Sequence, residues 1–241
     1  MKLPFRKNKK KAPPRGKLIV IDGIDGSGKS TQLQLLEQEL KVAGYQTEVI
    51  HFPQHGQPSA ALVDEYLSGK YGQLNSYATS IVYAADRFAA SQKIENWLKE
   101  GKIVLSDRYV TANAGHQGGK ISDGFERLKF FKWLDNLEYN IFGIPRPDFN
   151  IILSLPYMTA HKLLKKRKTA AGHTDNMHEK NLTHLRLAEE AYKQIAKLFP
   201  NTKLITCVSG KGKQETLLTE HEIHNNVWEL VRRIALKDFN P

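Results

Sequence analysis

The chain has 241 residues, enough to bury the core of one large α/β domain, and we take one domain as the default. Its 36 basic and 25 acidic residues give a formal net charge of +11 at pH 7, a balance that by itself is typical of nucleic-acid binders. No run of 18 apolar residues is present, so we expect no transmembrane helix.

The N-terminal segment carries most of the excess positive charge. Eight of the 36 basic residues and no acidic residue lie within positions 1–17, which leaves 28 basic and 25 acidic residues in the remainder. We expect residues 1–16 to form a flexible basic arm without the apolar core of a secretory signal, followed by one folded domain over residues 17–241. A solvated tail is the simplest interpretation of the arm; contact with a polyanion and a targeting role are the alternatives.

Short apolar runs alternate with segments of helical periodicity along the rest of the chain. Strands are predicted at residues 18–21, 47–52, 102–109, 149–155 and 203–208. Helices are predicted at about residues 30–44, 59–69, 77–99, 124–140, 157–166, 181–198 and 221–236. This alternation predicts right-handed βαβ connections, and hence a three-layer α/β/α fold around a parallel five-stranded sheet that binds ligands at the carboxyl ends of its strands.

One residue after the first predicted strand comes "GIDGSGKS", which matches the phosphate-binding pattern G-x-x-x-x-G-K-[ST] in its expected position between a strand and a helix. Backbone N–H groups of such a loop converge on phosphate oxygens, Lys29 would reach the terminal phosphates, and the Ser30 hydroxyl would coordinate Mg²⁺. The predicted ATP-binding residues are Gly23, Ile24, Asp25, Gly26, Ser27, Gly28, Lys29, Ser30 and Thr31. The sequence therefore predicts a site for a nucleoside triphosphate.

A phosphate-binding loop alone leaves motor, GTPase, ATPase and kinase functions open. The guanine-reading pattern [NT]-K-x-D of GTPases is absent, and the third predicted strand ends in "LSDRY" instead of the D-x-x-G or D-E of many ATPases. Asp107 could still serve the metal, while Arg108 places a fixed cation in the same crevice. Such a cation is expected if a second anionic phosphate approaches the first.

The motifs together resemble the thymidylate kinase (dTMP kinase) family of nucleoside monophosphate kinases. The matching segments are "GIDGSGKSTQ", "FPQ", "YAADR", "SDRY", "HQGGK", "IPRPDFNIILSLP" and "DNMHEKN", in this order over roughly residues 17–236. The resemblance implies a P-loop kinase fold with a mobile lid over about residues 165–180, transfer of the γ-phosphoryl group of ATP to dTMP with Mg²⁺, and a homodimer.

Two residues acquire roles at the acceptor phosphate and sugar from this resemblance. Asp25 would hydrogen-bond the deoxyribose 3′-hydroxyl, and Arg108 would bind the phosphate of dTMP. An acidic residue in a phosphate-binding loop makes electrostatic sense if its target is a hydrogen-bond donor. Ser30 and Asp107 are the predicted metal ligands, and together with Asp25 and Arg108 they form the predicted polar centre of the site.

Four further residues would contact the base if the resemblance holds. Phe52 and Tyr83 would line the nucleobase pocket, Arg87 would hydrogen-bond the thymine edge, and Gln117 would read the base amide face. Structural explanations stay open beside these roles: Phe52 as core, Arg87 on a solvated helix face, and Gln117 on the surface of a glycine-flanked loop.

Two features depart from the family pattern. Many members place an arginine just after the Phe-Pro, where it grips the acceptor phosphate, but this chain has Gln54 and His55 there, so either one phosphate anchor is missing or His55 replaces it at reduced charge. Some members supply a catalytic arginine from the P-loop and others from the lid; the P-loop position here is Gly26, so we expect the lid to provide the cation. Arg167 is the only arginine of the lid and the predicted catalytic residue, assisted by the neighbouring Lys165, Lys166 and Lys168.

The single cysteine, Cys207, has no partner for a disulfide within the chain, which suits a reducing compartment, and we expect a cytoplasmic location. Its place in an apolar run predicts a buried strand residue and not a nucleophile.

Three other functions compete with dTMP phosphorylation. The first is a P-loop kinase for another nucleoside monophosphate or a deoxynucleoside, and the second is a catalytically weakened homologue. The third is a nucleic-acid-binding P-loop ATPase, for which the basic arm is the only support, because no aromatic residues are interleaved with the basic ones.

Overall fold

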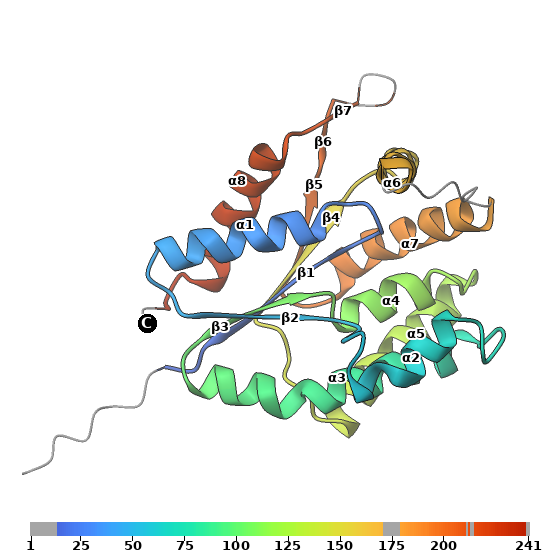
Figure 1. Ribbon diagram of the computed structural model, residues 1–241, viewed down its shortest axis with the longest axis horizontal. Coiled ribbons are helices and arrows are strands. Elements are labelled where there is room, and N and C mark those ends of the chain that lie inside the picture. Colours follow the sequence, from blue (N-terminus) through green and yellow to red (C-terminus); the bar gives the residue numbers. More distant parts are fainter. Residues whose placement is uncertain (1–13, 171–178, 211, 213–214, 240–241) are drawn as a thin grey trace, which may run out of the picture.

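A five-stranded parallel sheet forms the centre of the fold in the computed structural model, which describes residues 14–170, 179–210, 212 and 215–239 (Figure 1). The strands run in the order β2-β3-β1-β4-β5. Their bounds are β1 Lys17–Gly23, β2 Thr47–His51, β3 Ile103–Asp107, β4 Phe149–Ser154 and β5 Thr202–Thr206. All five strands were predicted, and the parallel α/β architecture is confirmed.

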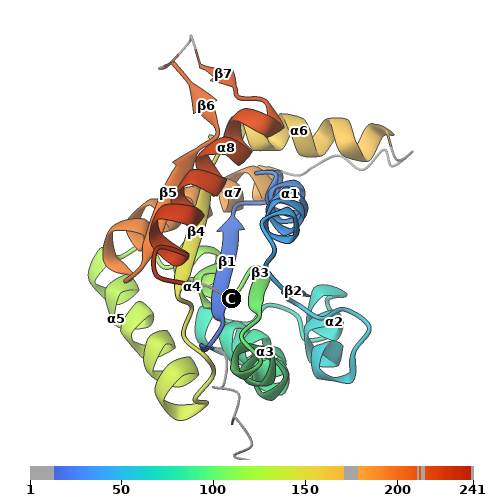
Figure 2. The same ribbon diagram turned by 90° about the vertical axis from the view of Figure 1, so that its left-hand side faces the viewer.

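Helices cover both faces of the sheet, as the two views show (Figures 1 and 2). One face carries α1 (Lys29–Val42) and α8 (Glu220–Leu230), which continues as the π-helical turn η4 (Val231–Ala235). The other carries α3 (Ser76–Lys99), α4 (Val110–Gly118), α5 (Gly124–Asp135) with its π-helical extension η2 (Asn136–Ile141), and α7 (Glu179–Leu198). The short η1 (Pro58–Ala60) and α2 (Ala61–Leu67) follow β2, and α6 (Tyr157–Ala170) follows β4.

The central strands are apolar on both faces because helices cover both faces. Residues 18–21 of β1 and 103–105 of β3 are fully buried without any alternation of polar and apolar side chains, the pattern expected of a parallel sheet. The register sets Ile21 opposite Asp107, and His51 opposite the same Asp107. The carboxyl ends of β1, β2 and β3 therefore meet at one edge, where the phosphate-binding loop begins.

Helix α4 is an element that the sequence analysis missed, since no helix or strand was predicted between residues 109 and 124 and Gln117 was placed in a glycine-flanked loop. The glycines are required by close packing. A Cβ at Gly115 would lie 2.5 Å from the ring of Tyr192, and one at Gly119 would lie 2.8 Å from the carbonyl oxygen of Leu187. Glycine thus allows α4 to approach α7 closely. The second missed feature is a short antiparallel hairpin of β6 (Val208–Ser209) and β7 (Thr216–Leu217).

The predicted arm and the predicted lid both lie partly outside the described residues. Residues 1–13 of the predicted arm and residues 171–178 of the predicted lid lie there. Gly16 belongs to the folded body: its N–H donates to the Leu98 carbonyl at 2.7 Å, and a Cβ there would lie 1.8 Å from the Lys102 carbonyl oxygen. Among the helices that the structure describes, none is long and apolar enough to cross a membrane.

Candidate active site

The phosphate-binding loop connects the end of β1 to the first turn of α1, as predicted. Gly26 and Gly28 have φ angles of 83° and 88°, which L side chains rarely adopt. The loop therefore curls so that the N-terminus of α1, with its unpaired N–H groups and the positive end of its dipole, faces the hollow above the sheet.

Lys29 lies at the base of this loop with only 8% of its surface exposed. Its Nζ donates to the carbonyl oxygens of Gly23 at 3.1 Å and Ile24 at 2.9 Å. Burial, and then repulsion by Arg108, lowers the pKa of Lys29 to about 8. Asp25, whose Oδ1 lies 3.9 Å from Nζ, acts in the opposite direction together with Asp22 and Asp107, but these carboxylates do not outweigh burial and Arg108.

A cavity of about 430 Å³ opens in front of Lys29. Its lining joins the phosphate-binding loop to α6 and α7 and includes Lys29, Ser30, Thr31, Asp107, Arg108, Arg167 and His184. Arg167 of the predicted lid thus borders the phosphate hollow, whereas Lys165 and Lys166 line a separate shallow hollow on α6. Of these three cations of the described residues, Arg167 is the one placed where a triphosphate would bind.

Ser30 and Asp107 lie side by side at the edge of this cavity. The Ser30 hydroxyl donates to Asp107 Oδ2 at 3.0 Å, and His51 Nδ1 lies 3.5 Å from the same oxygen. Asp107 Oδ1 is buried and has no hydrogen-bond partner among the described residues. Hydroxyl and carboxylate oxygens are ligands that Mg²⁺ prefers, and Mg²⁺ typically takes only one or two from the protein beside phosphate and water, so this pair fits the predicted ion.

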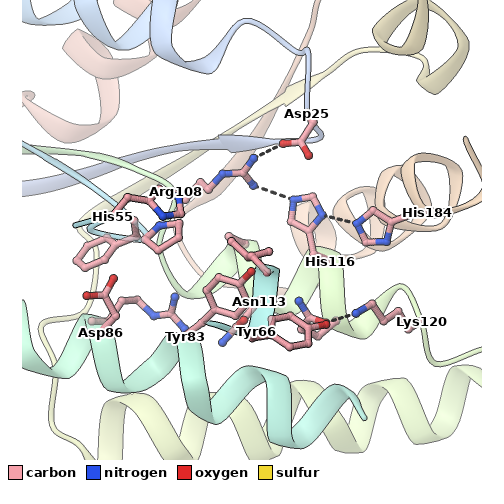
Figure 3. Close-up of a pocket in the computed structure, with 16 residues that line it drawn as sticks. Asp25, His55, Tyr66, Tyr83, Asp86, Arg108, Asn113, His116, Lys120 and His184 are labelled. Carbon is pink, nitrogen blue, oxygen red and sulfur yellow. Dashed lines mark hydrogen bonds and ion pairs between the residues drawn. The ribbon is translucent and has the colours of Figure 1, made fainter. Parts of the chain in front are cut away.

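Arg108 stands at the junction of the loop and β3. Its backbone is in the left-handed region with φ 67°, and its carbonyl oxygen accepts from Ser106 Oγ at 2.6 Å. This turn directs the guanidinium toward the P-loop, where Nη2 pairs with Asp25 Oδ1 (Figure 3). Burial opposes the ionisation of Asp25, but Arg108, His116 and Lys29 outweigh it and hold the pKa of Asp25 well below its usual range.

A second cavity, of about 390 Å³, adjoins the first. All six residues predicted to contact dTMP line it: Asp25, Phe52, Tyr83, Arg87, Arg108 and Gln117. Burial raises the pKa of the Tyr83 phenol to about 12, so this hydroxyl is a neutral hydrogen-bond donor at neutral pH. Asp25, Arg108 and His184 line both cavities and mark the boundary between them.

Arg87 is fixed from behind by a carboxylate that the sequence analysis did not identify. Its Nε and Nη2 donate to the two oxygens of Glu138, both at 2.6 Å, and the side chains are 2% and 0% exposed. Asn113 Nδ2 lies 3.4 Å from the same carboxylate. The alternative of a solvated Arg87 is therefore wrong, and the bidentate pair leaves Nη1 as the guanidinium nitrogen available to the cavity.

Gln54 and His55, which follow Phe52-Pro53, make contacts with two different carboxylates. Gln54 donates from its backbone N–H and its Nε2 to the Asp86 carboxylate, at 2.8 and 3.0 Å, and Ser59 Oγ donates to it at 2.6 Å. His55 lines the second cavity, with its Nδ1 2.5 Å from Asp64 Oδ1. Gln54 is thus engaged with the helix behind it, and His55 is the residue of this pair that faces the acceptor side.

The family comparison agrees with this geometry. A family model described as thymidylate kinase matches residues 21–217. The chain belongs to the thymidylate kinase family. The thymidylate kinase of Mycobacterium tuberculosis is 33% identical over 141 residues, which cover 57% of this chain and 65% of that relative. The thymidylate kinase of Afipia carboxidovorans is 32% identical over 225 residues, covering 91% of this chain and 90% of the relative.

A solved thymidylate kinase structure from Candida albicans has the same fold. It superposes with a TM-score of 0.67 at 22% identity and covers 91% of this chain and 92% of that one. The resemblance stated from the motifs is therefore confirmed at the level of the family and the fold.

Several residues of the site were not predicted because α4 was interpreted as a loop. On a helix, Ala112, Asn113 and His116, which were not predicted, share one face with the predicted Gln117, and all four line the second cavity. Helical spacing of the polar residues in "NAGHQ" is the signal that could have identified them. His184 and Glu138 come from distant segments, and no local pattern marks them.

Buried Asp22 holds this side of the site together. Its carboxylate accepts from Tyr192 Oη at 2.6 Å and from Thr111 Oγ1 at 2.7 Å, which ties α7 and α4 to the end of β1. Burial raises its pKa. Cys207 is also buried, and burial raises its thiol pKa to about 12, which agrees with the prediction that it is no nucleophile.

Proposed function

We propose that this chain transfers the γ-phosphoryl group of ATP to dTMP, giving dTDP and ADP. The observation that carries the proposal is the pair of adjoining cavities with Asp25, Arg108 and His184 at their boundary. One is built on the phosphate-binding loop, and the other gathers the six residues that the family resemblance assigns to dTMP. Donor and acceptor phosphates would meet at that boundary.

The donor phosphates would occupy the loop. Lys29 would turn from the two backbone carbonyls to the terminal phosphates, whose negative charge would add to that of Asp25 and favour the charged ammonium. Arg167 would approach the transferred group from the lid side and offset the charge that develops on it. Both residues act by position and charge, which is the main demand of phosphoryl transfer.

The acceptor would enter the second cavity with its base between Phe52 and Tyr83. Arg87 would offer Nη1 to the thymine edge, and Gln117 would read the amide face. Asp25 would accept a hydrogen bond from the 3′-hydroxyl while Arg108 binds the acceptor phosphate. This placement aligns an oxygen of dTMP with the γ-phosphorus.

The chemical step then needs no strong general base, because the acceptor is already an oxyanion. An oxygen of the dTMP phosphate attacks the γ-phosphorus as the bond from that atom to the bridging oxygen of ADP breaks, and the electron pair of that bond leaves with ADP. Ser30 and Asp107 would hold Mg²⁺, which when bound neutralises charge on the phosphates.

Product formation with purified protein tests the proposal. With ATP and Mg²⁺, the chain should convert dTMP to dTDP, and Lys29→Ala should lose that activity. Lys41→Ala, an exposed lysine of the same helix, is the matched control and should keep it. No dTDP above the level of Lys29→Ala would refute the proposal. Parallel assays with dUMP, CMP and thymidine separate dTMP kinase from the other P-loop kinases.

A weakened homologue is the second candidate, because Gln54 and His55 replace the phosphate-gripping arginine. It is distinguished by dTMP binding without turnover. A nucleic-acid-binding ATPase would instead bind polynucleotides with steep salt dependence, and that binding would vanish on deletion of residues 1–13, which leaves Gly16 of the folded body in place.

We also infer a cytoplasmic homodimer. Tyr77, Ile81 and Phe88 lie on α3 with 38%, 47% and 52% of their surfaces exposed, an apolar stripe that a second copy could cover. Light scattering after gel filtration should give twice the chain mass, and Phe88→Glu should give the monomer mass. A monomer from the unaltered chain would exclude this assembly.

A further inference from the structure

Three side chains from three segments form a hydrogen-bonded chain at the boundary of the two cavities (Figure 3). Arg108 Nη1 lies 2.8 Å from His116 Nε2, and His116 Nδ1 lies 3.1 Å from His184 Nε2. The two imidazoles stack with their planes 19° apart. Arg108 follows β3, His116 belongs to α4, and His184 lies near the start of α7, the helix that follows the lid.

The chemistry of arginine fixes the direction of every bond in this chain. A guanidinium can only donate, so His116 Nε2 must accept. The proton of neutral His116 is then on Nδ1 and is donated to His184, whose Nε2 must accept in turn. The proton of His184 therefore lies on Nδ1. One tautomer of each histidine is compatible with the geometry, and the second is dictated by the first.

The surroundings favour the neutral forms that this chain requires. Burial, followed by the charge of Arg108, lowers the pKa of His116, and burial, followed by Lys120, lowers that of His184. Asp25 acts in the opposite direction on both, while Lys29 adds to the effect of Arg108 on His116. The ring of Tyr192, packed edge-on to His116 at 5.7 Å, completes the enclosure from α7.

We infer that His184 is a positioning residue for Arg108: by accepting from His116, it stabilises the tautomer of His116 that accepts from the arginine. His184 touches neither phosphate in this scheme. It links the helix after the lid to the cation that would hold the acceptor phosphate. The role rests on the proposed dTMP phosphorylation, in which Arg108 binds that phosphate.

Protonation of either histidine breaks the row of hydrogen bonds from Arg108 through His116 to His184. A protonated His184 presents a donor to the Nδ1–H of His116, and if His116 changes tautomer to accept it, its Nε2–H then faces the donor Arg108. Because the pKa of both histidines is lowered, the chain is intact at neutral pH and is lost as pH falls through those lowered values. Of its two side-chain partners among the described residues, Arg108 would then keep only Asp25.

Kinetics of four variants test this role. His184→Phe keeps a ring but removes the acceptor and should raise the KM for dTMP about fivefold, the effect of one net hydrogen bond, with little change in kcat. His184→Gln retains an acceptor at the corresponding atom and should stay within about twofold of the unaltered chain. His221→Phe and His221→Gln, at an exposed position of α8, are the matched controls and should change neither constant.

A double-mutant cycle separates positioning from packing. In a His116→Phe background, His184→Phe should have no further effect on KM, because the connection to Arg108 is already lost. Additive effects, or a His184→Gln variant as impaired as His184→Phe, would overturn the inference. The KM ratio of His184→Phe to the unaltered chain should fall toward one on acidification. Titration of the dTMP phosphate itself, with a second pKa near 6, is common to both proteins and cancels in that ratio.

A readout without turnover keeps this inference separate from the proposed function. Ring ¹⁵N chemical shifts of the full-length protein should show both His116 and His184 protonated on Nδ1 at neutral pH, and His184→Phe should reduce the share of the Nδ1–H tautomer of His116, which Arg108 alone then favours. An Nε2–H tautomer for either histidine would refute the proposed hydrogen bonds from Arg108 through His116 to His184, even if dTDP is formed. The Nδ1–H tautomers without dTDP formation would instead count against the activity alone.

Discussion

Lys29→Met should stabilise the nucleotide-free protein while removing the lysine that the proposed activity needs. The reason is that Lys29 is buried without a phosphate to balance its charge. Folding lowers its pKa from 10.5 to about 8, a difference that corresponds to about 3 kcal/mol of unfavourable free energy at neutral pH. Methionine keeps the unbranched stem and removes the charge.

The expected gain is smaller than this figure because Lys29 also donates two hydrogen bonds to backbone carbonyls. Each bond contributes about 1 kcal/mol net, and the two carbonyls border a cavity where water can replace the lysine. We therefore expect Lys29→Met to raise the free energy of unfolding by about 1–2 kcal/mol at pH 7, measured by urea denaturation without nucleotide.

The pH dependence of the difference identifies its cause. A folded pKa below the unfolded one means that the unfolded chain binds more protons between these two values, so the stability of the unaltered chain rises with pH there. The advantage of Lys29→Met should consequently be largest below pH 8 and shrink as pH rises from 8 toward 10.5. A variant that is less stable at pH 7, or whose advantage does not change with pH, would refute this reasoning. Lys41→Met, at an exposed position of the same helix, should change little at any pH.

Three further predictions concern Lys29, the buried pair of Arg87 and Glu138, and the contact of Gly115 with Tyr192. ATP binding at pH 8 should take up about half a proton, because the phosphates restore the charge of Lys29, which is half neutral in the free protein at that pH. Calorimetry in buffers of different ionisation enthalpy measures this proton uptake, and no uptake would contradict the lowered pKa of Lys29. Glu138→Ala should reduce the free energy of unfolding by about 3–5 kcal/mol, since it leaves Arg87 charged and buried, whereas the double variant Arg87→Met with Glu138→Leu should lose much less; equal losses in urea denaturation would exclude the buried pair as the cause. Gly115→Ala should destabilise by about 1–3 kcal/mol in thermal or urea unfolding, and Gly124→Ala, where a Cβ meets nothing, is its control; equal effects would show that the contact with Tyr192 is not limiting.

The elements that sequence predicted well are those whose signal is local. Uninterrupted apolar runs identify the buried strands, and the glycine spacing of the phosphate-binding loop is determined by its own backbone. Both follow from interactions within a few residues. The same holds for Arg108, whose place after an apolar strand brings it to the carboxyl edge of the sheet.

The parts that escaped prediction depend on contacts between distant segments. Gly115 and Gly119 look like loop residues until α7 is placed against them, and the polar face of α4 cannot be recognised without that packing. Glu138 pairs with Arg87 across 51 positions, and His184 with His116 across 68. No pattern along the chain connects such partners, so the tertiary fold decides which polar groups reach the site.

Gly26 packs directly against α6, the helix that carries Arg167, and this packing limits which residues position 26 can hold. A Cβ at residue 26 would lie 2.9 Å from both the Ala160 carbonyl oxygen and Leu164 Cγ, so α6 rests directly on the phosphate-binding loop. That seating brings Arg167 to the phosphate cavity. An arginine at position 26 would displace the helix that delivers the one at 167. The two proposed sources of a cation, residue 26 and Arg167, are therefore sterically exclusive in this chain, and an evolutionary exchange between them would require the phosphate-binding loop and α6 to change together.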